Sequence, residues 1–103
     1  MVRITSSIAA AWIGDVPEEK RFWTRDGRYL KNLNELKDAL EQMTDDTFQY
    51  HSNETKTDFS NWVKDVIGDD KLSRDLLKCT TRTHAAKVVA NRISWLGIKA
   101  NAS

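Results

Sequence analysis

The residues of this sequence whose types allow catalysis or metal binding are two histidines, one cysteine and several pairs of carboxylates. His51 precedes Asp58 by seven residues. Asn61 and Trp62 follow Asp58 in the helix that is predicted to begin near it. We expect His51 to donate a hydrogen bond to Asp58, which would fix the loop between them. Alternatively, His51, Asp58 and Asn61 form a polar cluster beside the Trp62 ring that binds a small ligand, a metal ion or a peptide.

No complete catalytic or metal-ligand motif surrounds these residues. A structural zinc site takes four Cys or His ligands, more than the one cysteine and two histidines present. Cys79 and His84 have the types for nucleophilic catalysis, but their spacing does not bring them together. Carboxylate pairs at 45–46 and 69–70 stand where helices are expected to begin, so capping explains them. We therefore predict no catalytic residue, no metal and no cofactor.

Hydrophobic periodicity predicts that helices position these side chains. The clearest apolar stripe is Phe59, Trp62, Val63, Val66 and Ile67. Further stripes are Ile4, Ile8, Ala11 and Trp12; Leu33, Leu36, Leu40 and Met43; Leu72, Leu76 and Leu77; and Ala85, Ala86, Val89, Ile93 and Leu96. Helix caps are expected at Asn32 with Glu35, at Thr44, at Gly68 in a left-handed conformation, and at Asp69 or Asp70.

A β-hairpin is expected around Asp26-Gly27, because this dipeptide favours a tight two-residue turn. That register places Trp23 opposite Leu30 and Arg25 opposite Arg28. Since an isolated hairpin is marginally stable in water, the face with Trp23 and Leu30 should lie against helices.

The fold class is therefore mainly α: a small bundle of about five helices with a short N-terminal β-hairpin. The 103 residues, 40% hydrophobic and with a net charge of +1, are expected to form one domain, in which residues 1–17 are a peripheral helix. The apolar run Ile8–Ile13 is too short for a secretion signal or a membrane span. The lone Cys79 excludes an internal disulfide and favours the cytoplasm.

The near-zero net charge hides uneven segments. Residues 35–77 hold five basic and eleven acidic side chains, and residues 78–103 hold five basic and no acidic ones. The basic last helix either compensates the acidic middle helices or contacts the phosphates of a nucleic acid. The residues of that nucleic-acid interpretation are Arg25, Arg28, Lys78, Arg82, Arg92 and Lys99.

A second apolar flank is predicted on the last helix, expected from about Arg82 to Ile98, where Val88 and Trp95 lie off the main stripe and Ile98 lies further round. Either the N-terminal helix covers this flank, or the flank binds a partner helix or a second copy of the chain.

Three segments resemble a prokaryotic family of small domains of unknown function: Tyr50-His51, then Asp58-Phe59-Ser60-Asn61-Trp62, then Gly68-Asp69. The family pairs a Tyr-His segment with an Asp-Phe-x-Asn-Trp motif and a Gly-Asp turn, and the resemblance covers about residues 22–77. It implies a fold unit of prokaryotic origin and supplies no mechanism.

We expect the chain to be a non-enzymatic protein-interaction or accessory module that binds a protein partner or itself. No membrane is expected among its partners. Nucleic-acid binding is the alternative, and a small metal-dependent enzyme that uses His51 and Asp58 comes third.

Overall fold

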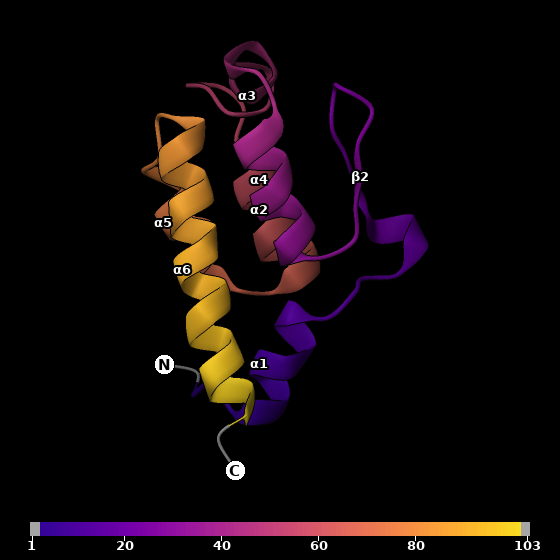
Figure 1. Cartoon of the computed structure of the whole chain (residues 1–103), viewed down its shortest axis with the longest axis vertical. Helices are drawn as coiled ribbons and strands as arrows, with labels where there is room; N and C mark the ends of the chain where they lie inside the picture. The colour runs from indigo at the N-terminus through magenta and orange to yellow at the C-terminus, as the bar shows by residue number, and fades with distance from the viewer. Residues whose placement is uncertain (1–2, 102–103) are drawn as a thin grey trace.

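A computed structural model of the chain describes residues 3–101 and is 67% helical (Figure 1). The elements in chain order are α1 (Ser6–Ile13), a 3-10 helix (Glu18–Lys20), β1 (Phe22–Trp23), β2 (Tyr29–Leu30), α2 (Leu33–Gln42), α3 (Asp45–His51), α4 (Asp58–Trp62), a π-helical segment (Val63–Ile67), α5 (Asp70–Leu77) and α6 (Arg82–Asn101). The predicted mainly α fold with a short N-terminal hairpin is confirmed.

The helices begin where short polar side chains satisfy backbone N–H groups. Asn32 accepts a hydrogen bond from the backbone N–H of Glu35 at 2.8 Å, and the Glu35 carboxylate accepts one from the N–H of Lys31 at 2.9 Å. Thr44 and Asp69 cap α3 and α5 with their own side chains. These caps lie at the predicted positions, because a cap depends on only four or five consecutive residues.

The core lies mainly between α2 and α6, which run side by side, while α1 packs beside α6 near the chain ends (Figure 1). Leu33, Leu36, Leu40, Val89 and Leu96 are fully buried in this core. One residue of the stripe predicted for α5 is not in the core. The side chain of Leu77 is 56% exposed at the last turn of α5, although Leu72 and Leu76 of the same helix are buried.

Helix α1 packs through part of the predicted face. Ile4 and Trp12 pack against the core as predicted, but Ala9 is fully buried and Ala11 is exposed, so Ala11 was wrongly placed on the buried stripe. Trp12 packs against the core and lies over Gly68, where an added Cβ would approach the Trp12 Nε1 atom to 3.2 Å. Gly68 has a φ of +99° and ends the π-helical segment, as its predicted left-handed conformation requires.

The hairpin register also differs from the prediction. Phe22 lies opposite Leu30, and Trp23 lies opposite Tyr29. The turn holds three residues, 25–27, because Thr24 pairs with Arg28 and the backbone N–H of Gly27 donates to the Thr24 carbonyl at 3.0 Å. Gly27 takes a φ of +91°, which suits a type I turn followed by a left-handed residue.

The new register changes which side chains face the helices. Leu30 is buried and Phe22 packs against the core, whereas Trp23 is 64% exposed. Trp23 therefore does not join Leu30 against the helices, and Arg25 does not lie opposite Arg28. Across residues 3–101, no helix has both the length and the apolar character needed to cross a membrane.

Candidate functional site

His51, at the end of α3, uses both nitrogens of its ring in hydrogen bonds. Its Nδ1 atom lies 3.0 Å from the Asp58 carboxylate, and its Nε2 atom accepts a hydrogen bond from the backbone N–H of Arg25 at 2.9 Å. Because Nε2 accepts, the ring proton is on Nδ1 and is donated to Asp58. His51 thus links α3, the start of α4 and the tip of the hairpin.

The surroundings of His51 are apolar. The imidazole is 4% exposed and lies with its ring centroid 5.2 Å from that of Phe22 and 5.3 Å from that of Phe59. Asp58 also accepts from the Lys56 ammonium at 3.2 Å. With both nitrogens engaged and the ring enclosed, the imidazole offers no lone pair to a metal ion or a substrate proton.

Asn61 and Trp62 do not complete a polar cluster with His51 and Asp58. Asn61 is exposed to solvent. Trp62 is 7% exposed, and its indole N–H donates to the backbone carbonyl of Lys20 at 2.8 Å. The structure therefore joins only His51 and Asp58 directly, and Trp62 instead fastens the segment before the hairpin to α4.

The cysteine is similarly enclosed. Cys79 is 6% exposed, and its thiol lies 3.5 Å from the backbone carbonyl of Asp75. Burial, and secondarily the Asp75 carboxylate, raise the pKa of the Cys79 thiol above its ordinary value of 9.0. A thiol that stays protonated at neutral pH is a poor nucleophile. In the described part of the chain, no three His, Cys, Asp or Glu residues are grouped so that they could hold a metal ion.

Two of the basic residues predicted to meet phosphates are used inside the fold. Arg82 pairs with Asp45 at 2.9 Å and donates to the Leu40 and Glu41 carbonyls at the end of α2. Arg92 is 9% exposed and forms an ion pair with Asp69. The basic last helix thus neutralises acidic residues of the middle helices at these two positions.

The other four cations of that interpretation are scattered. Lys78 is exposed at the end of α5, and Lys99 is half-buried near the end of α6. At the hairpin tip, the Arg25 guanidinium lies 4.5 Å from the centroid of the Tyr50 ring, and Arg28 pairs with Asp26 at 3.3 Å. Arg25 and Arg28 are therefore separated from the cations of α6 along the sequence and in the fold.

The second apolar flank of α6 is partly covered. Val88 is half-buried and packs against the core. Trp95 is 43% exposed, with the Arg92 guanidinium 4.5 Å from its ring centroid, and Ile98 is 75% exposed one turn further on. Only the Trp95 and Ile98 portion of the predicted flank is open to a partner.

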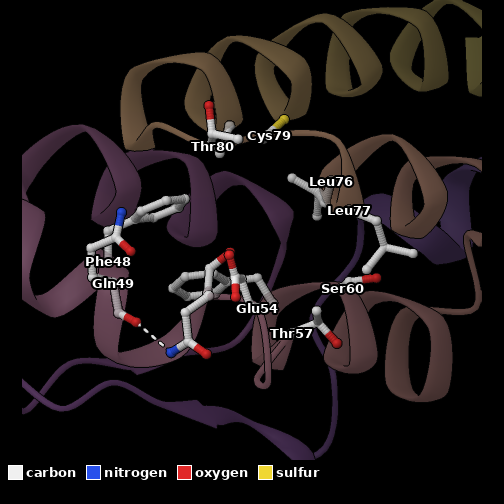
Figure 2. A pocket seen from close by; sticks show the side chains of 13 residues that line it. Phe48, Gln49, Glu54, Thr57, Ser60, Leu76, Leu77, Cys79 and Thr80 are labelled. Carbon is white, nitrogen blue, oxygen red and sulfur yellow. Dashed lines mark hydrogen bonds between the residues drawn. The ribbon is translucent and has the colours of Figure 1, made fainter.

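A cleft that the sequence analysis missed lies between α3, α4, α5 and the start of α6 (Figure 2). Its volume is about 350 Å³, within the range of about 300–1,000 Å³ that is usual for ligand sites. The apolar lining residues are Phe48, Phe59, Leu76, Leu77, Cys79 and Ala85. The polar lining residues are Gln49, Ser52, Asn53, Glu54, Thr57, Ser60 and Thr80.

The His51 hydrogen bonds and an Asn53 turn hold one wall of this cleft. Asn53 donates to the Gln49 carbonyl at 2.8 Å and accepts from the backbone N–H groups of Thr55 and Lys56. These bonds fix the loop that holds Glu54 in the lining of the cleft (Figure 2). The sequence gives no local signal for the cleft, because its walls come from segments far apart along the chain.

Comparison of the chain with protein-family models, with curated proteins and with solved structures finds no significant match.

Proposed function

We propose that this chain is a non-enzymatic protein-interaction module that binds a short segment of a partner protein in the cleft. The observation that carries the proposal is the cleft itself, whose lining combines apolar side chains with amide, hydroxyl and carboxylate groups. Binding sites commonly combine an apolar base with a few polar groups that orient the ligand.

The exposed Leu77 favours a protein segment over a small molecule. Leu77 lines the cleft and is still 56% exposed, so a ligand confined to the cleft leaves much of the Leu77 side chain in water. A protein segment that continues past the cleft covers Leu77 as well. Gln49 and Glu54 supply oxygen atoms that backbone N–H groups of such a segment can bond.

The charge of the cleft indicates the chemistry of the segment. Glu54 is the charged residue among those that line the cleft, and residues 35–77 hold eleven acidic and five basic side chains. We therefore expect a segment with an apolar side chain next to a lysine or arginine, since complementary charge favours encounter and register.

The non-enzymatic part of the proposal is supported by the side chains best suited to catalysis. His51 has both ring nitrogens in hydrogen bonds, and the Cys79 thiol is buried with a raised pKa. A metal-dependent enzyme that uses His51 and Asp58 would first have to break the bond that closes the hairpin onto α3. Nucleic-acid binding by α6 is disfavoured because Arg82 and Arg92 are already paired.

Self-association is a second candidate, favoured by Trp95 and Ile98. They lie three residues apart on α6, so both face the same side of the helix, and both are exposed. A dimer through this face would be weakened by Ile98→Asp. Sedimentation velocity distinguishes the two candidates, since the cleft proposal needs no dimer and the α6 proposal requires one.

The proposal extends to the setting of the protein. A buried lone cysteine and a fold without a disulfide suit a reducing compartment, so we propose the cytoplasm. The Tyr50-His51, Asp-Phe-x-Asn-Trp and Gly-Asp segments support a prokaryotic origin through the resemblance given above.

A displayed library of random peptides tests the cleft. Peptides selected on the wild-type chain should carry an apolar residue beside a basic one and shift the amide resonances of residues 48–60 and 76–80. Leu77→Glu should weaken their binding at least about tenfold, while Ile98→Glu, at a more exposed apolar position on α6, should not. Equal binding to the wild type and to Leu77→Glu, or shifts confined to α6, would overturn the proposal.

A further inference from the structure

The outer face of the hairpin carries a pair of aromatic rings, of which Trp23 is exposed and Tyr29 is half-buried. The observed register turns Phe22 and Leu30 toward the core, so Trp23 and Tyr29 point away from it. Their ring centroids are 4.3 Å apart, and the ring planes differ by 25°. Trp23 is 64% exposed, which leaves the second face of its indole open to a flat ligand.

A cation with unused hydrogen-bonding capacity lies beside this pair. The Arg21 guanidinium is 5.3 Å from the centroid of the Tyr29 ring. Among residues 3–101, the Nε atom of Arg21 is the buried side-chain polar atom that lacks a hydrogen-bond partner. Native proteins satisfy nearly all such atoms with a protein group or ordered water. Because this Nε atom is itself enclosed, a ligand would contact the terminal nitrogens of the Arg21 guanidinium. Phosphate oxygens are suitable acceptors for a guanidinium.

Trp95 and Arg92 on α6 form the same kind of pair without this capacity. The Arg92 guanidinium lies 4.5 Å from the Trp95 ring centroid, but its Nε and Nη2 atoms both donate to Asp69. An anionic ligand at Trp95 would therefore find its cation already neutralised. The arginine beside Trp95 on α6 is therefore neutralised, unlike the one near Trp23 on the hairpin. Trp95→Ala is the matched control for Trp23→Ala.

We propose that the outer face of the hairpin binds single-stranded nucleic acid, with one base stacked on Trp23 and the adjacent phosphate bound by Arg21. Aromatic side chains with neighbouring arginines are a common means of binding unpaired bases without sequence preference. A duplex keeps its base faces inside the stack, so it does not fit this site. Lys31, at the end of β2, has a 41% exposed side chain and lies 3.9 Å from the Asp15 carboxylate in a solvent-exposed ion pair. The inference is independent of the proposed cleft.

Several charges near the hairpin are paired within the fold, although Glu18 and Glu19, just before Arg21, are exposed. Asp26 is paired with Arg28, and Asp58 with Lys56, so two nearby carboxylates are neutralised within the fold. The Tyr50 ring has two cations over it: the Arg25 guanidinium lies 4.5 Å from its centroid and the Lys56 ammonium 3.9 Å. These two contacts bring positive charge to the hairpin tip beside α3.

The test is fluorescence anisotropy with labelled DNA and RNA strands of mixed sequence, about twelve nucleotides long. The full chain should bind single strands more tightly than a duplex of the same sequence, and more weakly as salt rises. Trp23→Ala should weaken binding at least about fivefold, Trp23→Phe should retain most of it, and Trp95→Ala should leave it unchanged. Arg21→Gln should weaken binding and reduce its salt dependence.

The hairpin must remain folded in each variant, and the Arg25 amide resonance bonded to His51 reports this. If Trp23→Ala loosens the hairpin, Trp23→Leu keeps an apolar side chain opposite Tyr29 and replaces it in the comparison. Absence of single-strand binding at low salt, equal losses in Trp23→Ala and Trp95→Ala, or equal affinity for the duplex overturns the inference. If a short polyglutamate peptide displaces the single-stranded nucleic acid at a concentration similar to that of the nucleic acid, the face is assigned to acidic protein segments instead.

Discussion

Arg92 and Asp69 form a buried ion pair between the middle of α6 and the first residue before α5. Two bonds join them, from Arg92 Nε to Asp69 Oδ2 at 2.7 Å and from Arg92 Nη2 to Asp69 Oδ1 at 3.0 Å. Asp69 also accepts from the backbone N–H of Leu72 at 3.2 Å and so begins α5. One carboxylate thus sets both the start of a helix and its packing against α6.

Removing one partner of this pair should be strongly destabilising. Arg92→Met leaves the Asp69 charge buried without its counter-ion, which costs about 3–5 kcal/mol of the free energy of unfolding. Asp69→Asn should cost a similar amount, because the arginine is then unpaired. Urea unfolding measures both. Arg74→Met, which breaks an exposed pair with Asp70, is the control and should change stability by at most about 1 kcal/mol. Equal effects of Arg92→Met and Arg74→Met would contradict the structural role of the buried pair.

Gly68 is the position where a single methyl group should be most harmful. Gly68→Ala forces an L-residue into a φ of +99° and places its Cβ 3.2 Å from Trp12 Nε1. The backbone conformation alone costs about 1–2 kcal/mol. Gly97→Ala is the matched control, since Gly97 lies within α6 and an added Cβ meets no atom within 4 Å. That variant should be more stable by about 0.5–1 kcal/mol, so thermal unfolding should move in opposite directions for the two glycines.

His51→Ala should loosen the hairpin as well as lower stability. The variant removes the acceptor for the Arg25 N–H and the donor to Asp58, and leaves space against Phe22 and Phe59. We expect a loss of about 2–4 kcal/mol and much faster hydrogen exchange of the Arg25 amide. Gln49→Ala, at an exposed position of α3 whose bond to Asn53 uses the backbone carbonyl, should leave that exchange nearly unchanged. Normal protection of the Arg25 amide in His51→Ala would show that the hairpin tip is held by other contacts.

The parts of the fold that depend on neighbouring residues could be predicted from the sequence. The caps at Asn32, Thr44 and Asp69 and the left-handed Gly68 each need only a few consecutive residues. The hairpin was located correctly, but its register was not, because Asp26-Gly27 suits both a two-residue turn and a three-residue loop that ends at Gly27. Hydrogen bonds of the Thr24 hydroxyl to Asp26 and Arg28 favour the longer loop.

The sites were harder to predict because they join distant segments. A local sequence motif suggested the contact of His51 with Asp58, yet nothing in it indicated that the Arg25 N–H occupies the other ring nitrogen. Arg92 lies seven residues after Ala85 and four before Leu96, on the buried stripe of α6. That spacing is a signal for a buried arginine, but its partner Asp69 is 23 residues away and only the packing of α5 against α6 brings them together.

Cys79 should be slow to react and should make stability depend on pH in the alkaline range. Burial first, and the Asp75 carboxylate second, raise the pKa of its thiol above 9.0. The folded state therefore favours the neutral thiol. The contribution of this thiol to the free energy of unfolding is complete below a pH of about 9 and is lost as the pH rises through the higher folded pKa. The stability advantage of the wild type over Cys79→Ala should accordingly shrink above that pH. Ellman's reagent at pH 8 should label native protein far more slowly than protein unfolded in guanidinium, and equal rates would mean that the thiol is open to solvent.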